Sequence, residues 1–483
     1  MNPTPIYLPC ATGVEPLLVD ELRAILLAAG APNAAESVQA GRGGASLIGS
    51  PASAMRLHLE SRLAQRVLWQ VAEAGYRDEH DIYDMARAVR WGDWITPRQT
   101  IRVDTTAVRS PLHSLHFASL RIKDAVCDAM RESHGERPDV DARHPDLPLV
   151  LHLSDRHATL SIDLSGEALF KRGWREVQGE APLKETLAAA MLAAAGWQGR
   201  EADGPLLDPC CGAGTIAIEA AQIACGIAPG LQRHFVFEKL APFRAEAQAW
   251  QQMKAEARER IHLPAVKVYA GDVSFRMTDF ATRNAERAGV AHAIDFKTVD
   301  ALQRSAPAPS GVLMLNPPYG ERIDAKGSGS VRGRDESAQR PGTRIAGGER
   351  FGSQRDAGDR FGQRFDTGDR TRRGPHGDAG DHLGPRTDAG AREGFEGGGT
   401  SAVFFSALAA HWKRHYSGWT AWVLSPDAKL PQAMRLKESR RVPMWNGPIE
   451  CRLFRFDLVA GSMRGPREDA APAAPAAPDQ PAA

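Results

Sequence analysis

Two short stretches, about one hundred residues apart, contain the residue types that chemistry on a nucleotide requires. In the first, an apolar run at Pro205–Leu207 is followed by Asp208 and by the glycines Gly212 and Gly214. In the second, the apolar run Val312–Leu315 is followed directly by Asn-Pro-Pro-Tyr. The first stretch predicts a strand that feeds a glycine loop for a nucleotide-like cofactor. The second predicts a strand exit that holds a planar base by its exocyclic amine.

The glycine loop fits more than one cofactor. Gly212 and Gly214 lack the Cβ atoms that would keep the backbone away from a ligand at a helix amino end. Together with Ala217 they also fit a dinucleotide fingerprint, but that site needs an acid about twenty residues further on. The next acid at a predicted strand end is Asp272. Because Asp208 stands directly before the loop, the pattern favours a methionine-type cofactor whose ammonium pairs with a carboxylate. A plain tight turn is the alternative.

Two further acids follow predicted strands. Asp272 ends Ala270-Gly-Asp and Asp300 ends Thr298-Val-Asp. Ligands of parallel sheets bind at the carboxyl ends of the strands, where both side chains are expected. A carboxylate can accept hydrogen bonds from both ribose hydroxyls or from an adenine amine. We therefore expect Asp272 to bind the ribose and Asp300 the adenine; taken singly, each could be an ordinary loop acid.

The Asn-Pro-Pro-Tyr turn is the most specific pattern. The Asn316 side-chain carbonyl and the Pro317 backbone carbonyl can both accept from an exocyclic amine, which turns the nitrogen lone pair toward a sulfonium methyl. Pro318 stiffens the turn, and Tyr319 is expected to stack on the base. In-line positioning supplies most of the rate of such a transfer, so no strong general base is needed. The alternative is a proline-rich strand exit with a core tyrosine.

Composition limits what else the chain could be. Its 483 residues suggest about three domains, and a net charge of +1 with 25% charged residues describes an ordinary globular protein. Any RNA binding must therefore use a local patch.

Six scattered cysteines without a C-x-x-C motif argue against a zinc ribbon and a disulfide framework, and we expect no metal. No export signal or long apolar run is present, so we expect a cytoplasmic protein that does not enter membranes.

The first 165 residues predict an α+β module separate from the catalytic sheet. Its predicted strands are 5–9, 45–48, 100–104, 149–153 and 158–164, and its predicted helices are 14–29, 54–74 and 112–133. The last two helices also carry basic positions, among them Arg62, Arg66 and Lys123.

From residue 181 onward the pattern becomes doubly wound α/β. We predict a helix over 183–197 and strands at 205–207, 266–270, 294–299, 311–315, 419–424 and 451–456. Residues 325–399 are rich in Gly, Arg and Asp and predict a disordered insertion, and 461–483 predict a Pro/Ala-rich disordered tail. The insertion follows the Asn-Pro-Pro-Tyr turn closely, so it could influence how RNA enters.

These motifs, with Leu164-Ser-Gly, Ala181-Pro-Leu-Lys-Glu-Thr-Leu and Asn446-Gly-Pro-Ile-Glu-Cys, resemble the THUMP-domain class I RNA methyltransferases, and among them the RlmL half of the bacterial 23S rRNA guanine-N2 methyltransferases. The resemblance implies a Rossmann-like class I methyltransferase sheet preceded by an α+β ferredoxin-like/THUMP RNA-binding module. The implied parts are a ferredoxin-like segment (1–50), a THUMP-like domain (51–165), a linker with the first catalytic helix (166–200) and a methyltransferase domain (201–324 and 400–460).

The resemblance also implies the reaction and the residues that take part. The methyl donor would be S-adenosylmethionine, and the substrate would be the N2 amine of a guanine in 23S rRNA or a large-subunit precursor, at position 2445. The implied cofactor-facing residues are Asp208, Cys210, Gly212, Gly214, Asp272 and Asp300; Asn316, Pro317, Pro318 and Tyr319 would face the guanine, and Arg62, Arg66 and Lys123 would contact phosphates.

The sequence departs from the family at two cofactor positions. Cys210 stands where many members have a methionine-like residue, and Ser274 where many have a second acid. Some relatives carry a second, fused methyltransferase domain, and we expect a single activity and a monomer here. The alternatives are methylation of a tRNA guanine or of an adenine N6, since the turn recognises an amine rather than a particular base. A further alternative is a non-catalytic role in RNA binding or ribosome assembly.

Overall fold

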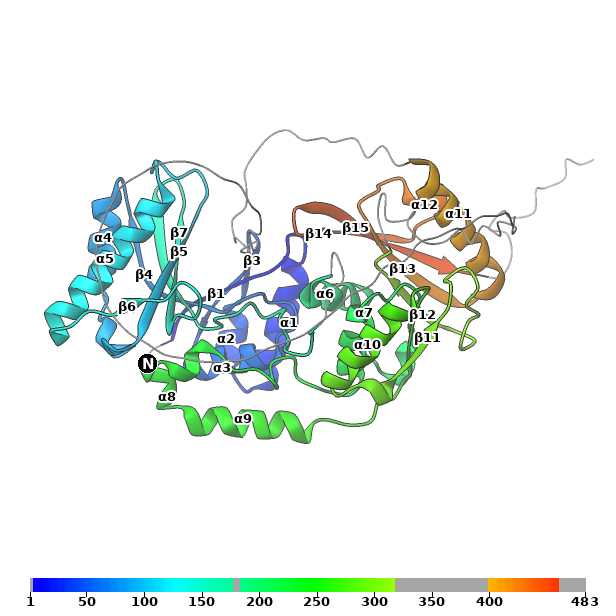
Figure 1. Ribbon diagram of the computed structural model, residues 1–483, viewed down its shortest axis with the longest axis horizontal. Helices are drawn as coiled ribbons and strands as arrows, with labels where there is room; N and C mark the ends of the chain where they lie inside the picture. Colours follow the sequence, from blue (N-terminus) through cyan, green and yellow to red (C-terminus); the bar gives the residue numbers. More distant parts are fainter. Residues whose placement is uncertain (1–2, 177–182, 318–397, 460–483) are drawn as a thin grey trace, which may run out of the picture. The chain divides into compact units, whose positions relative to one another are not determined.

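The computed structural model describes residues 3–176, 183–317 and 398–459, which form two separate β-sheets with their helices (Figure 1). Pro318, Tyr319 and the predicted tail lie outside the described residues. So does the predicted insertion, apart from its last two residues, which begin a helix at Gly398. Within the described ranges, no helix is long and apolar enough to cross a membrane.

The amino-terminal sheet has eight strands in the order β2-β3-β1-β4-β8-β7-β5-β6. The strands are β1 (Thr4–Pro9), β2 (Gln39–Gly41), β3 (Gly44–Gly49), β4 (Leu68–Gly75), β5 (Thr100–Ala107), β6 (Asp139–Val140), β7 (Leu147–Leu153) and β8 (His157–Asp163). Its helices are α1 (Glu15–Ala28), α2 (Pro32–Glu36), α3 (Pro51–Glu60), α4 (Glu79–Arg87) and α5 (Leu115–His134). Helices α4 and α5 pack on each other and on strands β4 and β5 (Figure 1). The predicted α+β module, with a sheet of its own, is confirmed.

The helix predicted over 54–74 is wrong in its second half. Helix α3 ends at Glu60, where Ser61 is already extended (φ −69°, ψ 126°), and Leu68–Gly75 form strand β4. Strand β4 lies between β1 and β8 and pairs with both. Because this pairing outweighs the local helix propensity, the segment is extended. Helix α4 was not predicted, although Asp78 caps it by accepting hydrogen bonds from His80 N and Asp81 N.

The second sheet has seven strands in the order β11-β10-β9-β12-β13-β15-β14. The strands are β9 (Leu206–Asp208), β10 (Val268–Asp272), β11 (Ile294–Thr298), β12 (Gly311–Leu315), β13 (Trp419–Ser425), β14 (Arg440–Asn446) and β15 (Ile449–Leu458). Strands β9 to β13 are parallel, and β15 and β14 are antiparallel additions at one edge. The predicted Rossmann-like sheet is confirmed, while β14 was not predicted. Strand order reverses beside β9, and sheets of this kind bind ligands at such a switch point.

The helices of this part lie before and between its strands in the sequence. They are α6 (Glu185–Ala195), α7 (Thr215–Ala224), α8 (Ala241–Arg244), α9 (Ala247–Glu259), α10 (Phe275–Arg287), α11 (Gly398–His415) and α12 (Leu430–Met434). On one side of the sheet a separate core cluster contains Trp412, Tyr416, Trp419, Phe454 and Phe456, all nearly inaccessible to solvent. Aromatic burial on this scale contributes several kcal/mol, about 1.5–3 kcal/mol for each large side chain.

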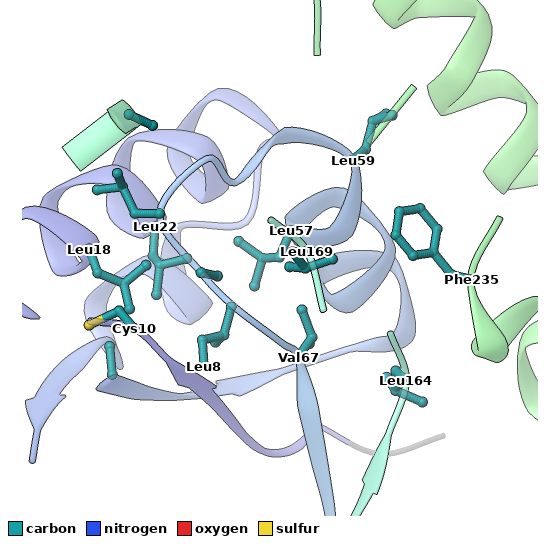
Figure 2. Packing of buried hydrophobic residues seen from close by; sticks show 14 of the residues in the cluster. Leu8, Cys10, Leu18, Leu22, Leu57, Leu59, Val67, Leu164, Leu169 and Phe235 are labelled. Atoms are coloured by element: carbon teal, nitrogen blue, oxygen red, sulfur yellow. The ribbon is translucent and has the colours of Figure 1, made fainter. Parts of the chain in front are cut away.

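Segments far apart in the sequence share the larger core. Figure 2 shows Leu8, Leu22 and Leu57 of the amino-terminal module beside Leu169 and Phe235, which come later in the chain. All five side chains are at most 3% exposed. The core of the module is therefore completed by the linker and by the segment that precedes α8.

A buried ion-pair cluster joins the same segments. Glu219 of α7 is fully buried; its Oε1 accepts from Arg172 Nε (3.1 Å) and its Oε2 from Arg62 Nη1 (3.3 Å). Arg172 Nη2 also donates to the backbone carbonyl of Arg62 (2.7 Å), and Arg62 Nη2 donates to the carbonyl of Ile227. With both cations satisfied by one carboxylate and by carbonyls, the cluster avoids the large cost of an unpaired buried charge.

We predict that Glu219→Gln destabilises the protein strongly, because it removes the carboxylate that pairs with both the buried Arg172 and Arg62. The expected loss is about 3–5 kcal/mol of unfolding free energy, measured by urea denaturation. Glu438→Gln, which removes the half-buried partner of the exposed Arg441, should change stability by at most about 1 kcal/mol. Equal midpoints for the two variants would contradict the structural role given to Glu219.

Candidate functional site

The glycine loop connects β9 to α7 and contains two glycines in the left-handed region. Gly212 has φ +51° and Gly214, the residue before the first turn of α7, has φ +88°. A Cβ on Gly214 would lie 3.0 Å from the Cβ of Ala281, so this glycine lets α10 pack closely on the loop. A Cβ on Gly212 would meet nothing nearer than Met277 Cε at 3.9 Å. Both positions need glycine for their backbone conformation, and Gly214 needs it for packing as well.

Backbone hydrogen bonds tie this loop to the neighbouring strand ends. Cys211 N donates to Gly271 O (2.7 Å), and Gly212 N donates to Asp272 Oδ2 (3.0 Å). Val299 N in turn donates to Asp272 O (2.9 Å), which brings the turn that carries Asp300 to the end of β10. The carboxyl ends of β9, β10 and β11 thus bring the three predicted acids to one edge of the sheet.

The three acids are held differently. Asp272 Oδ1 accepts from Ser274 N (2.9 Å) and its Oδ2 from Gly212 N, while Asp300 Oδ1 accepts from Leu302 N (2.9 Å). Asp272 and Asp300 are half-buried, and each carboxylate oxygen still has a lone pair for a ligand hydroxyl or amine. Their orientation is therefore fixed by backbone groups without using up their capacity to accept.

Asp208 differs from the other two because it is 1% exposed. Its Oδ1 accepts one hydrogen bond, from Cys210 N at 3.2 Å. The pKa of Asp208 is raised to about 8, mainly because the carboxyl group is buried. The nearby Asp272 also raises this pKa, whereas the hydrogen bond from Cys210 and the Arg304 guanidinium lower it. A buried carboxylate with so little compensation is suited to receive a cationic group from a ligand.

The thiols in the loop are not reactive groups. Burial and the carboxylates of Asp208, Asp272 and Asp300 raise the pKa of Cys210 well above its usual value. Burial and the same kind of repulsion raise the pKa of Cys211 as well. Both thiols stay protonated at neutral pH, so neither acts as a nucleophile. Among the described residues, no group of His, Cys, Asp and Glu is arranged to hold a metal ion.

Asn316 leaves the sheet next to this edge. Strand β12 pairs with β9 in parallel, with Val312 opposite Leu206 and Leu313 opposite Leu207. Asn316 follows the end of β12 and is half-buried, and Pro317 is buried. The two residues are thus placed at the strand end that adjoins Asp208, where strand order reverses. The other two residues of the turn lie outside the described residues.

The three basic residues predicted to contact RNA differ in their exposure and in their ion pairs. The geometry argues against Arg62, whose guanidinium pairs with Glu219, and against Arg66, which pairs with the buried Asp163 and donates to Gly166 O (2.6 Å). Both side chains are only 15% exposed, so a phosphate could reach them only if these contacts broke. Lys123 on α5 is 34% exposed and pairs with Asp124 (2.8 Å); its contact with RNA stays a prediction.

Two arginines near the site, the half-buried Arg175 and the buried Arg304, were not predicted. Arg175 Nη2 donates to Thr215 Oγ1 (2.6 Å) at the first turn of α7, and its Nε donates to Glu185 (2.7 Å). Arg304 is 4% exposed and donates from Nη1 to Ala270 O (2.6 Å). Arg304 stands in the loop after Asp300, where no strand, helix or glycine pattern distinguishes it from a solvated residue.

Three family profiles match the chain in sequence order. They are described as an RlmL ferredoxin-like domain (residues 5–68), a THUMP domain (76–163) and an RMKL-like methyltransferase domain (172–331). The last of these contains the glycine loop, all three acids and Asn316.

Curated relatives match over nearly the whole chain. Ribosomal RNA large subunit methyltransferase K/L of Syntrophotalea carbinolica is 34% identical over 97% of this chain and 56% of that protein. The protein of the same name from Shewanella amazonensis is 32% identical over 94% of this chain and 53% of that protein. The chain therefore spans about half the length of the curated relatives it matches.

A solved structure shares the fold. The crystal structure of SMU.472, described as a methyltransferase complexed with SAH, superposes with a TM-score of 0.70. It covers 96% of this chain and 100% of that chain at 21% sequence identity. Likeness at this level of identity supports the fold and says nothing by itself about the ligand of this chain.

We predict that Asp208→Asn stabilises the unliganded protein, and that the gain grows between about pH 5 and pH 8. The pKa of Asp208 is higher in the folded protein than in the unfolded chain. The wild-type protein is therefore most stable below about pH 4, where Asp208 is protonated in both states, and it loses stability as the pH rises toward about 8. Asparagine cannot ionise and can still accept from Cys210 N. Melting temperatures of both proteins across this range test this, and a gain that is constant with pH would contradict it.

Proposed function

Since this chain belongs to the THUMP-domain methyltransferases, we propose that it transfers a methyl group from S-adenosylmethionine to the exocyclic N2 amine of a guanine in 23S rRNA. The observation that carries the proposal is the convergence of Asp208, Asp272, Asp300 and Asn316 at one edge of the second sheet. A sheet of this order binds ligands at that edge.

Each part of the cofactor has a matching group. The ammonium of the methionine portion pairs with Asp208, whose buried carboxylate accepts a hydrogen bond from Cys210 N. Asp272 accepts from the ribose hydroxyls and Asp300 from the adenine amine. Cys210 and the glycines Gly212 and Gly214 form the floor of the loop against which the amino-acid portion lies. The RMKL-like methyltransferase profile and the relatives named as methyltransferases support this choice of methyl donor.

The substrate amine is held at the end of β12. The side-chain carbonyl of Asn316 and the backbone carbonyl of Pro317 accept its two hydrogens, with Pro318 and Tyr319 completing the turn and the stacking surface. The amine lone pair forms the new N–C bond while the methyl–sulfur bond breaks, so the sulfonium becomes a neutral thioether. The extra proton then leaves the nitrogen for solvent. Positioning dominates the rate in such a reaction.

The choice of 23S rRNA, and of position 2445 within it, rests on the family. The THUMP domain and the relatives named as ribosomal RNA large subunit methyltransferases support an RNA substrate over DNA. Lys123 on α5 is the one predicted phosphate contact that we retain. A monomer that works in the cytoplasm on rRNA or on a large-subunit precursor fits this activity. A non-catalytic role is disfavoured, because it would not require the acids and Asn316 to converge.

We predict that the purified protein, given S-adenosylmethionine and unmodified 23S rRNA, produces N2-methylguanosine. Mass spectrometry of the digested nucleosides identifies the product, and Asp208→Asn protein serves as the inactive control. N6-methyladenosine as the product would assign the amine to adenine. Product from tRNA but not from rRNA would move the substrate to tRNA, and either result would overturn the proposal.

We also predict that Asn316→Ala lowers turnover by roughly 10²-fold or more, as losing a positioning group does. Binding of S-adenosylhomocysteine, measured by calorimetry, should stay within about twofold because Asn316 faces the amine. Asn33→Ala, at an exposed position of α2, is the matched control and should retain both properties. A loss of cofactor affinity comparable to the loss of turnover would mean that Asn316 belongs to the cofactor site.

A further inference from the structure

Helix α10 presents one buried polar side chain to the glycine loop. Asn284 is fully buried, and its Nδ2 donates to the backbone carbonyl of Ala213 (3.0 Å), the residue between the two loop glycines. One turn earlier in the same helix, Ala281 packs against Gly214, where a Cβ would lie 3.0 Å from the Cβ of Ala281. The loop therefore meets a small side chain and a hydrogen-bond donor on adjacent turns of α10.

The orientation of the Asn284 amide is set by Arg287. Arg287 Nη2 donates to Asn284 Oδ1 (2.7 Å), and because an arginine can only donate, the amide oxygen must face Arg287 and the NH₂ group must face the loop. Arg287 is held in turn, since its Nε donates to Trp174 O (2.9 Å) and its Nη1 pairs with Glu176 (2.6 Å). A chain of contacts therefore leads from Trp174 and Glu176 to the carbonyl of Ala213.

The peptide group between Ala213 and Gly214 is held on both sides. Its carbonyl accepts from Asn284, and its N–H, which belongs to Gly214, donates to Cys211 O (2.8 Å). The carbonyl and the N–H of a trans peptide point in opposite directions, so the two bonds together set the plane of this peptide. Gly212 and Gly214 both have positive φ, and because glycine backbones rotate easily, the peptide would turn readily without these bonds.

We propose that Asn284 is a positioning residue, which holds the glycine loop in the shape that receives the amino-acid portion of the cofactor. This inference rests on the proposed function, which places that portion of S-adenosylmethionine against the loop. Asn284 does not touch the cofactor in this scheme; it acts through the carbonyl of Ala213. Without this donor the buried carbonyl would lack a partner, and the glycines on either side would let its peptide turn away to find one.

The adenosine portion of the cofactor should not depend on Asn284. Gly212 N donates to Asp272 Oδ2, so the start of the loop is tied to the predicted ribose site by a bond of its own. Asp300 accepts from Leu302 N (2.9 Å). Both bonds lie outside the peptide that Asn284 holds. The loss of Asn284 should therefore weaken ligands that carry an amino-acid portion and spare ligands that lack it.

Calorimetric binding of two ligands to the full chain tests the proposal. S-adenosylhomocysteine carries the amino-acid portion, and 5′-methylthioadenosine lacks it. Asn284→Ala should weaken S-adenosylhomocysteine roughly tenfold, the effect of one lost hydrogen bond, and leave 5′-methylthioadenosine within about twofold. Asn284→Asp keeps the volume but can only accept when ionised beside Arg287, so it should weaken S-adenosylhomocysteine at least as much. Equal weakening of both ligands, or full affinity in Asn284→Asp, would overturn the proposal.

Gln222→Ala is the matched structural control. Gln222 of α7 is also buried and donates to Ala288 O, just after α10 (3.5 Å), so its loss removes a contact between the same two helices without touching the loop. The Gln222→Ala protein should bind S-adenosylhomocysteine within about twofold of the wild type, because the plane of the loop peptide is unchanged. A tenfold loss in this variant as well would show that binding responds to helix packing in general, and would overturn the proposal.

A double-mutant cycle tests the link through Arg287. Arg287→Met removes the group that orients the Asn284 amide, so it should weaken S-adenosylhomocysteine by a smaller factor, roughly threefold. In the Asn284→Ala background it should have no further effect, since the amide that it orients is gone, and fully additive effects would overturn the proposal.

Arg287 is 32% exposed, so Arg287→Met can replace Asn284→Ala if that variant does not fold. Weakening of S-adenosylhomocysteine alone would then support the proposal, whereas equal weakening of both ligands, or of neither, would overturn it. Failure of the wild-type protein to bind S-adenosylhomocysteine would count instead against the proposed function.

Discussion

A carboxylate buried at the end of the central strand is the constraint around which the second sheet is organised. Asp208 is almost inaccessible, accepts one backbone hydrogen bond and has its pKa raised to about 8. Such a group weakens the unliganded fold, and proteins retain that cost where a site must be ready for a charged ligand. Around it lie a loop with two glycines of positive φ and acids at two neighbouring strand ends.

The acids and the loop could be predicted from the sequence because each follows a strand that nearby residues reveal. Parallel pairing then brings the ends of these strands to one edge of the sheet. Asp272 and Asp300 each follow a predicted strand, and parallel pairing of β9, β10 and β11 places both at the sheet edge that carries Asp208. The basic positions were harder to interpret. Arg62 looks like a solvated helix charge in the sequence, and only the fold shows that Glu219, far away in the chain, lies against it. The same limit applies to β4, whose two partner strands come from distant segments.

The chain on either side of residues 318–397 contributes to one sheet. Asn316 lies just before that segment, and α11 begins just after it. Residues beyond the end of α11 contact earlier parts of the chain: Tyr416 donates to the carbonyl of Arg304, and β13 pairs with the whole length of β12. Residues 318–397 therefore separate, in sequence, two strands that the sheet places side by side.

The burial of the thiols has a practical consequence for following this protein in solution. All six cysteines are free, and burial raises the pKa of every one of them, that of Cys10 to about 12. Maleimide and similar reagents react with thiolates, so the native chain should label slowly at neutral pH. A single cysteine introduced at the half-exposed Lys123 would then carry a fluorophore or a photocrosslinker almost alone. The natural cysteines should therefore add little unwanted label when an optical probe is attached to α5.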